Sequence, residues 1–469
     1  MVKELEAEMS GDVMLFEALA RRFHANADEF FPPQIDAVLG CFARLGYADE
    51  ALLRGFAGRL GDLASDASAR RVVRLLRNGS ALQLRPDAWL EGLLPQLCEQ
   101  LPNMRAGVPS ALGSLHALRW RDGEMVELLL TQGLIVAEDL DIEFFARLYE
   151  RWSRFGLEKA DLEQRVFEMA ESGQTKDLDL RDCLNLLVGL SRCPNPKARG
   201  ARDRIEAHLE ARLKGTAGAG GKAPQGATAA EAATCLEWMS RLSLRSEKLW
   251  LACADAVQLA MQDLAFARER LPNAVHDLAS LTGGKAGELA LVAALLAAPE
   301  TSKVAHLHNA WQLTQLLRAG CLVKFLAADG LEISLEGFLA SAMRMSRQLS
   351  LPQRRLLREA VEVLPGLGVP GAPEAVASVR ALPISALPPL LGDPAQREEE
   401  DTFVEVGGHA VQVASEADQR GFRYVAMRDT FAGSVRTGQA EVQSASLTPS
   451  CRLTLRALVA QGWRVEMRA

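Results

Sequence analysis

The stretch LGCFARLGYADEALLRGFAGRL, residues 39–60, places apolar side chains three or four positions apart. This spacing is typical of an amphipathic α-helix, because residues i, i+3 and i+4 lie on one helical face. The pattern extends from about residue 12 to residue 364, where Leu, Ala, Arg and Glu dominate and Pro and Gly separate the segments. The sequence therefore predicts a mainly α-helical protein.

The helical segments resemble one another at a nearly constant period. Equivalent positions, here called anchors, recur 32 to 39 residues apart, with one interval of 51, at Ala43, Ala81, His116, Ser153, Gly189, Ser240, Ala279, Gln315 and Arg347. The long interval contains the Gly/Ala-rich stretch KGTAGAGGKAPQGATAA, and subtracting roughly 15 residues for it restores the period. At two positions, four residues before each anchor and two residues after it, most of the side chains are apolar.

About nine degenerate helical hairpins account for this period. A hairpin of this length cannot bury its apolar face alone, so neighbouring hairpins stack into an α-solenoid. We therefore expect an α-solenoid over residues 1–364, with a flexible insertion at 214–230. The alternative is an irregular all-α domain whose helices have similar lengths.

The composition changes after residue 364. Closely spaced prolines and an acidic run predict a linker, or an extended segment packed on the last repeat, over residues 365–401. TFVEVGGHAVQV (402–413) alternates around a Gly pair and predicts a hairpin, and GFRYVAMR (421–428) predicts another strand. TPSCRLTLRALVAQG (448–462) predicts a helix capped by Thr448 or Ser450 and by Gly462, followed by the strand WRVEMR. Residues 402–469 are thus expected to form a small C-terminal α/β module.

Two landmarks of this module resemble the RAP domain, an organellar RNA-associated module. They are VEVGGHAV (404–411) and LTLRALVAQGWRVE (453–466), in the order found in that family. The family's usual aromatic after His is here Ala410, and Arg452 and Arg456 stand in place of its late-helix lysine. Helical repeats ahead of a RAP domain also occur in that family, as in heptatricopeptide, octotricopeptide and FAST-kinase-like architectures.

The resemblance implies a non-enzymatic organellar RNA-binding protein that binds or stabilises RNA, with rRNA of a divergent mitochondrial ribosome as the expected target. It implies a mitochondrial location, with a plastid as the alternative. The RAP fold also resembles restriction-type nucleases, which need clustered carboxylates and a lysine. Asp401 and Glu405 supply carboxylates, but no lysine follows Lys324, so we expect no enzyme activity.

Other catalytic or cofactor patterns are incomplete. GTAGAGGK (215–222) has Thr216 where a phosphate loop needs Gly, and Ala223 where it needs Ser or Thr. His306 and His308 diverge on a helix and have no third metal ligand nearby. The eight cysteines form no CxxC pair and lie in apolar helical contexts typical of buried thiols. We expect neither a metal nor another cofactor.

Basic residues at helical spacing are the candidate RNA contacts. Three clusters and the C-terminal module supply them: Arg70, Arg71, Arg74 and Arg77; Lys197, Arg199, Arg202 and Arg204; Arg354, Arg355 and Arg358; and His409, Arg452, Arg456, Trp463 and Arg464. Guanidinium groups suit phosphate oxygens, and Trp463 is either a base-stacking side chain or a core anchor. Because Arg also favours helices, each cluster can equally be a solvated helix face.

Charge and hydropathy limit the choice of partners. The 53 Lys and Arg against 60 Asp and Glu give a net charge of -7, which argues against coating a polyanion over the whole surface. The longest apolar run, LALVAALLAA (289–298), is about half of what a membrane span needs, so we expect no membrane insertion. The acidic N-terminus shows no targeting peptide. The second hypothesis is a protein-binding structural scaffold subunit of a large organellar complex. The expected partners are RNA, with rRNA foremost, and other proteins of a large ribonucleoprotein assembly.

Overall fold

The computed structural model describes most of the helical part of the chain and short stretches of the C-terminal part. The described residues are 13–45, 59, 68–82, 93, 96–100, 107–118, 123–139, 142–155, 160–214, 225–298, 301, 308–327, 331, 333–382, 384, 403–406, 409–415, 419–424 and 447–468. Two compact units divide the chain. Unit 1 comprises residues 1–157, 350–355 and 383–413, and unit 2 comprises residues 158–349, 356–382 and 414–469.

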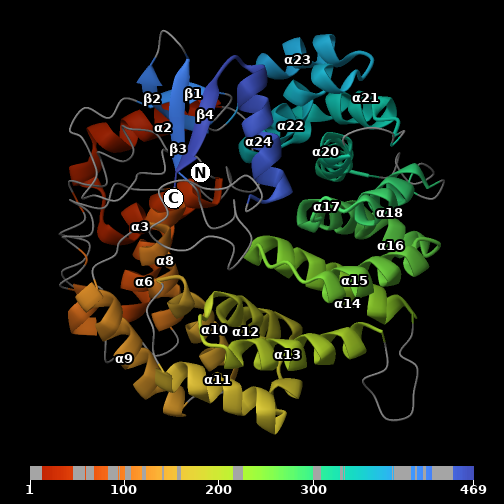
Figure 1. Cartoon of the computed structure of the whole chain (residues 1–469). Coiled ribbons are helices and arrows are strands. Elements are labelled where there is room, and N and C mark those ends of the chain that lie inside the picture. The colour runs from red at the N-terminus through yellow and green to blue at the C-terminus, as the bar shows by residue number, and fades with distance from the viewer. Residues whose placement is uncertain are drawn as a thin grey trace. The chain divides into compact units, whose positions relative to one another are not determined.

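Helices dominate both units, as the sequence predicts (Figure 1). Those before residue 157 are α2 (Val13–Ala25), η1 (Ala27–Glu29), α3 (Pro32–Leu45), α6 (Ala69–Ala81), α8 (Val108–Ala117), α9 (Gly123–Asp139) and α10 (Ile142–Ser153). Those from 158 to 300 are α11 (Ala160–Ser172), η4 (Gln174–Lys176), α12 (Leu180–Arg192), α13 (Lys197–Leu213), α14 (Gln225–Leu242), α15 (Glu247–Ala260), α16 (Leu264–Glu269), α17 (Leu271–Leu281) and α18 (Ala286–Ala297).

The later helices are α20 (Ala310–Leu326), α21 (Glu336–Arg344), η6 (Ser346–Gln348), α22 (Leu351–Val363), η7 (Pro365–Leu367), α23 (Ala372–Arg380) and α24 (Pro449–Ala460). Polar side chains begin several of these elements. Asp179 accepts a hydrogen bond from the backbone N–H of Asp182 at 2.7 Å, and Asn309 forms a capping box with Gln312. Such caps satisfy backbone donors that have no partner within the helix.

Eight of the nine anchors lie in helices that, within each unit, contact one another in sequence order, and we call these helices the anchor row. In unit 1, α3 contacts α6, α6 contacts α8, and α8 contacts α10. In unit 2, α12 contacts α14, α14 contacts α17, and α17 contacts α20. The anchors themselves lie mostly near the helix C-termini, and the ninth, Arg347, lies in η6. The repeated sequence positions thus correspond to repeated helix–helix contacts.

Apolar side chains four residues before the anchors form the core of this row. Leu39, Leu112, Tyr149, Leu236 and Val275 are all fully buried. In unit 2 a second set of helices lies beside the row, where α11 contacts α13 and α13 contacts α15. Helix α18 contacts both α17 and α20. Removing these side chains from water supplies the main driving force for stacking.

Two boundaries differ from the sequence-based expectation. Residues 225–230 of the predicted insertion belong to α14, while 215–224 lie outside the described residues. The predicted linker contains helix α23, which contacts α21. Ala-rich sequence favours a helix there, and proline near its start is compatible with the first helical turn. Residues 385–401 lie outside the described part of the chain.

Strands occur where the C-terminal pattern alternates. β1 (Phe403–Val406) and β2 (His409–Ser415) pair antiparallel, with Val406 opposite His409, so only two residues separate the strands. β3 (Arg420–Tyr424) and β4 (Arg464–Arg468) pair parallel, with Phe422 opposite Glu466. Helix α24 precedes β4, begins after the N-cap Thr448, and is followed by Gly462 with φ +90°.

Helix α24 packs on the anchor row within unit 2, where it contacts α17 and α20. The hydroxyl oxygens of Ser280 and Ser450 are 3.2 Å apart, and the Thr454 hydroxyl donates to Glu359 Oε2 at 3.3 Å. The same carboxylate oxygen accepts from Arg318 Nη1 at 3.0 Å. The C-terminal helix is therefore joined to the repeats by buried polar contacts.

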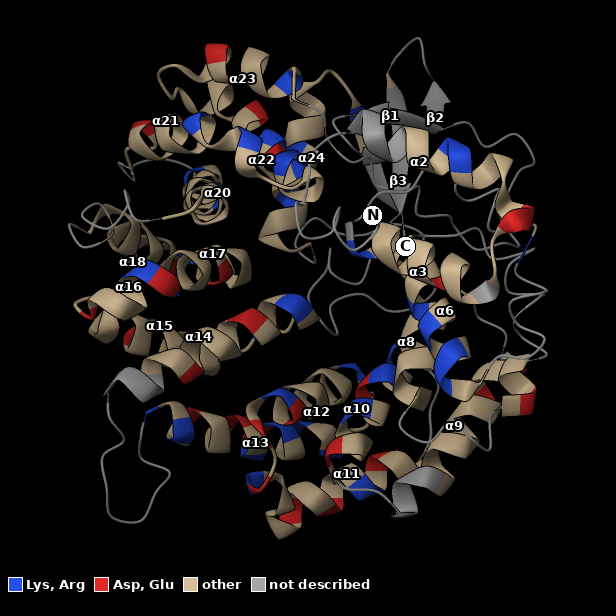
Figure 2. Ribbon diagram, turned by 180° about the vertical axis from the view of Figure 1, so that it is seen from behind, with Lys and Arg blue, Asp and Glu red and all other residues tan. Residues whose placement is uncertain are grey.

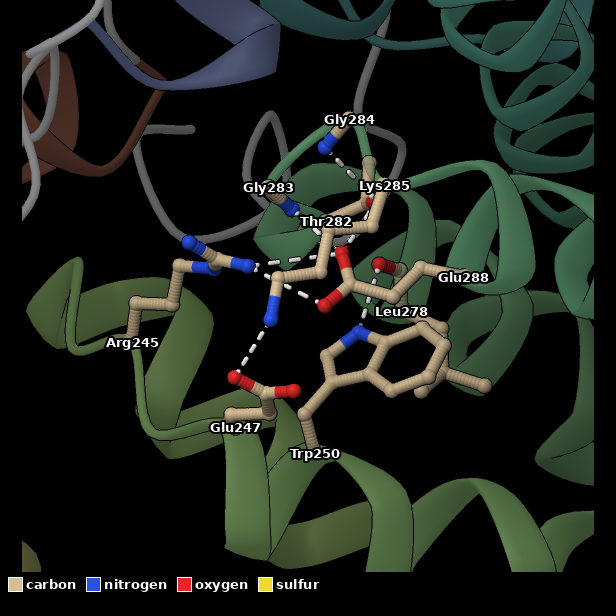
Figure 3. A network of polar contacts seen from close by, with 9 residues as sticks. All are labelled: Arg245, Glu247, Trp250, Leu278, Thr282, Gly283, Gly284, Lys285 and Glu288. Carbon is tan, nitrogen blue, oxygen red and sulfur yellow. Dashed lines mark hydrogen bonds and ion pairs between the residues drawn. The ribbon is translucent and has the colours of Figure 1, made fainter.

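A second polar network fastens the turn between α17 and α18 to the start of α15 (Figure 3). The buried Glu288 carboxylate accepts from Thr282 Oγ1 at 2.8 Å, from the Gly283 N–H at 2.6 Å and from Arg245 Nη2 at 3.0 Å. Gly283 leaves room for the Arg245 guanidinium, which an added Cβ would displace. Charge-assisted bonds of this kind fix the register between neighbouring helices.

Candidate nucleic-acid interface

The first arginine cluster lies on α6, and most of it faces solvent. Arg70, Arg74 and Arg77 are exposed at spacings of four and three residues, and Arg71 is half-buried. The opposite face of the helix buries Val72, Leu75 and Leu76 in the core. Figure 2 shows the resulting basic segments on α6. The three exposed guanidinium groups form what we call the α6 stripe.

The α6 stripe is only partly neutralised. Arg74 forms an ion pair with Asp36 of the preceding row helix α3, and Asp36 is 7% exposed. Within the described residues, Arg70 and Arg77 have no acidic partner within ion-pair distance. Two full positive charges therefore remain available to an anionic ligand.

Helix α10 carries a similar stripe that sequence reasoning missed. Arg147, Arg151 and Arg154 repeat the spacing of four and three residues and are all half-buried. The Glu150 carboxylate, 1% exposed, accepts from Arg154 Nε at 2.7 Å and lies 3.3 Å from Arg151 Nε. These residues belong to ARLYERWSRF, where acids and aromatics interrupt the arginines, so no basic run drew attention to them.

Helix α8 lies between the two stripes in the anchor row, because it contacts both α6 and α10. Gly113 of α8 leaves room for Arg151, since an added Cβ would lie 3.2 Å from the Arg151 side chain. Each stripe thus sends its middle arginine toward the preceding row helix, Arg74 to α3 and Arg151 to α8. Unit 1 gathers six arginines on two row helices that share a neighbour.

The second predicted cluster divides along α13. Lys197 and Arg199 are exposed near the start of the helix. Farther along, Arg202 pairs with Glu206 at 3.0 Å and Arg204 with Glu171 at 3.4 Å. Figure 2 shows basic and acidic residues interleaved on this helix. Counting the ion pairs of the described residues alone, unneutralised positive charge remains only in the first turn of this helix.

The third predicted cluster, on α22, is mostly removed from solvent. Arg354 and Arg355 are 6% and 8% exposed, and burial lowers the pKa of Arg354. Arg358 lies 3.6 Å from Glu362, whose other oxygen accepts from Arg380 Nη2 at 2.7 Å. These side chains lie among helices rather than on a surface open to a polyanion.

The predicted residues near the C-terminus lie in mixed environments. Burial lowers the pKa of the half-buried Arg452, whereas the exposed Arg456 lies 5.9 Å from the Phe325 ring of α20. Trp463 is 8% exposed, so it acts as a core anchor. Arg464 is exposed, and its backbone N–H donates to Gln419 O at 2.8 Å. His409 begins β2, and its side chain lies outside the described residues.

The other candidate chemistry gains little support from the described residues. Six cysteines are buried, Cys193 is half-buried and Cys98 is exposed. Burial raises the pKa values of Cys183 and Cys321 to about 12, so these thiols stay protonated and unreactive. His308 is buried, while His306, Asp401 and the 215–222 loop lie outside the described part.

Two searches of the described residues give negative findings. No group of three or more His, Cys, Asp or Glu side chains is arranged to hold a metal ion. None of the helices described combines the length and the apolarity needed to cross a bilayer. The arrangement that remains is a set of fixed arginine side chains suited to binding phosphate oxygens.

No protein-family model matches the sequence, and no curated protein matches it significantly. Functional inference consequently depends on the residues themselves.

Proposed function

We propose that this protein is a non-enzymatic RNA-binding α-solenoid that ends in a RAP-like α/β module. The observation that carries the proposal is the pair of arginine stripes on α6 and α10, two row helices that both contact α8. The guanidinium group of an arginine can donate two parallel N–H hydrogen bonds to the oxygens of one phosphate. Phosphate contacts of this kind supply most of the affinity for RNA. A net charge of -7 restricts such binding to local surfaces of this kind.

Resemblance of the C-terminal landmarks to the RAP domain supports an organellar setting. By that resemblance, the protein binds or stabilises rRNA as a component of a divergent mitochondrial ribosome, with a plastid as the alternative location. The contacts of successive row helices support a solenoid, since each repeat packs mainly on its neighbours. The β1–β2 and β3–β4 pairs, with α24 between β3 and β4, support the α/β module.

The test removes three positive charges from the stripes. The stripe variant is Arg70→Gln/Arg77→Gln/Arg147→Gln. The control variant is Lys176→Gln/Lys248→Gln/Arg268→Gln, which removes the same number of positive charges from exposed positions in unit 2. Binding of a fluorescent single-stranded RNA pool is measured by anisotropy at several salt concentrations. We expect the stripe variant alone to bind more weakly and to lower the salt slope by about 2. Equal loss in both variants, or no RNA binding by the unaltered chain, would contradict the proposal.

A protein-binding scaffold is the second candidate, and exposed leucines favour it. Leu251 and Leu259 of α15 are 46% and 71% exposed, and Leu264 of α16 is 64% exposed. Much of the positive charge in unit 2 is neutralised by ion pairs such as Arg212–Glu231 at 2.8 Å. Crosslinking mass spectrometry of the native organelle tests this candidate. Protein neighbours crosslinked beside α15, without RNA crosslinks to α6 or α10, would favour the scaffold.

A further inference from the structure

One half-buried tryptophan of the anchor row lies close to two arginines. Trp238 of α14 is half-buried, and the guanidinium carbon of Arg181 lies 4.5 Å from the centre of its ring. The guanidinium carbon of Arg241 lies 5.1 Å from the same centre. Arg181 belongs to α12, which contacts α14, so two successive row helices build this cluster.

The environment of Trp238 differs from that of a core tryptophan. Trp250 is 1% exposed and donates its indole N–H to Leu278 O at 3.0 Å, and Trp152 is 2% exposed. On α12, residues 182–190 are all buried, yet Arg181 is exposed beside the indole of Trp238. The helix pair therefore buries its apolar faces elsewhere and leaves this aromatic side chain partly open.

The charge of the cluster is not fully neutralised. Arg241 pairs with Glu237 at 2.5 Å. Arg181 has no carboxylate within ion-pair distance among the residues that the structure describes. An indole face holds each cation near it by cation–π attraction, which keeps both guanidinium groups in place without cancelling their charge. The cluster thus combines a flat aromatic surface with positive charge.

We propose that Arg181, Trp238 and Arg241 form a base-stacking site for single-stranded RNA. An unpaired base stacks on the indole or on an adjacent guanidinium plane, while the arginines contact the flanking phosphates. Aromatic stacking needs no particular base, because every base has a π-face. This inference rests on the proposed RNA binding and adds to it a preference for unpaired bases, at residues outside the arginine clusters considered above.

The experiment separates base contacts from phosphate contacts. Two fluorescent probes are used, a mixed-sequence single-stranded RNA pool of about 16 nucleotides and an abasic ribose-phosphate oligomer of the same length. The unaltered full chain is expected to bind the pool about tenfold more tightly than the abasic oligomer. In Trp238→Leu this ratio should fall toward one, and Trp238→Phe should retain most of it.

Two controls keep folding apart from binding. Trp311→Leu alters a half-buried tryptophan of α20 in the same row and should leave the ratio unchanged. Thermal unfolding of each variant identifies any that is misfolded. If Trp238→Leu is unstable, Trp238→Met takes its place, because methionine is also apolar and has no π-face. A Trp238→Leu variant that unfolds earlier but keeps the base preference would show a structural role only and overturn this inference.

The outcomes also distinguish this inference from the proposed function. If the unaltered chain binds both probes and Trp238→Leu keeps the ratio, the stacking site is wrong and RNA binding stands. If the unaltered chain binds neither probe, both are wrong. If crosslinks from Trp238 then reach only a protein neighbour, the cluster is a protein contact instead.

Discussion

Arginines on α6 and arginines around α22 occupy opposite environments. On α6, Arg70 and Arg77 are exposed and have no acidic partner among the described residues. Around α22, the carboxylates of Glu359 and Glu362 are 4% and 2% exposed and hold Arg318 and Arg380. Both helices are arginine-rich, but α22 also carries Glu359 and Glu362, whereas α6 carries no acidic residue.

The difference depends on what covers each helix. Helix α20 contributes Arg318, which reaches Leu356 O at 2.9 Å and Glu359 Oε2 at 3.0 Å on α22. Thr454 of α24 donates to the same carboxylate. Where neighbouring helices supply carboxylates, an arginine joins helices; where they do not, it stays available for a ligand. The following predictions test this contrast, from the largest expected effect to the smallest.

The largest effect is expected from Glu359→Gln. The neutral amide leaves the Arg318 guanidinium buried without its counter-charge, and both partners of the native pair are 4% exposed. We expect the free energy of unfolding to fall by about 3–5 kcal/mol, as for other broken buried pairs. Urea denaturation followed by circular dichroism measures it. As a control, Arg318→Met/Glu359→Leu should lose less than Glu359→Gln alone, and an equal or larger loss would contradict this explanation.

Gly283→Ala should have an intermediate effect. The added Cβ displaces the Arg245 guanidinium and so weakens its bond to the buried Glu288 (Figure 3). We expect a loss of about 1–3 kcal/mol in unfolding free energy. The matched control is Gly287→Ala, because a Cβ there meets nothing within 4 Å, and it should cause no loss. Equal denaturation midpoints for the two variants would mean that Arg245 does not hold this turn.

Arg70→Ala/Arg77→Ala should leave stability almost unchanged. Both side chains are exposed on α6 and join no helix to another, so we expect a change within about 0.5 kcal/mol. Thermal unfolding provides the measurement. A decrease of more than about 1 kcal/mol in the free energy of unfolding would contradict this contrast, because it would mean that Arg70 and Arg77 stabilise the fold as the arginines around α22 do.

The smallest effect concerns His208 of α13. Burial, followed by the charges of Arg212 and Lys176, lowers the pKa of this imidazole from its ordinary 6.5. The unfolded chain therefore binds the proton more tightly than the folded one. The stabilising contribution is present above about pH 6.5 and declines as the pH falls from there toward the folded-state pKa. Melting temperatures measured from about pH 8 to pH 5.5 should fall less for His208→Gln. Parallel curves would rule out this contribution.

Sequence periodicity predicted the helices because burial repeats with the helical period. Anchors such as His116 and Ala279 could be aligned since the side chains four residues earlier, Leu112 and Val275, are both apolar and fully buried. Helix α23 was missed because proline spacing suggested an extended segment, although PEAVASVR contains good helix formers. The β1–β2 hairpin was predicted correctly from alternation around the Gly pair.

The candidate site was less predictable than the fold. A basic run identifies arginines but does not reveal the carboxylates that tertiary packing brings to them, such as Glu171 beside Arg204. Other arginines lie outside any continuous basic run and are therefore missed, such as Arg151 and Arg154, which are separated by Trp152 and Ser153. Arg181 and Trp238 lie on different helices, 57 positions apart in the sequence, so no local motif joins them.

The docking of α24 sets the order in which unit 2 completes its folding during synthesis. A contact between neighbouring helices of unit 2 joins residues about 40 positions apart, as in Arg318–Glu359, whereas Ser280 and Ser450 are 170 apart. At about 5–20 residues per second, a ribosome takes roughly 10–30 s to synthesise that interval. For most of that time the faces of α17 and α20 that α24 covers remain open, so these faces are prone to aggregation until α24 has been synthesised and docks.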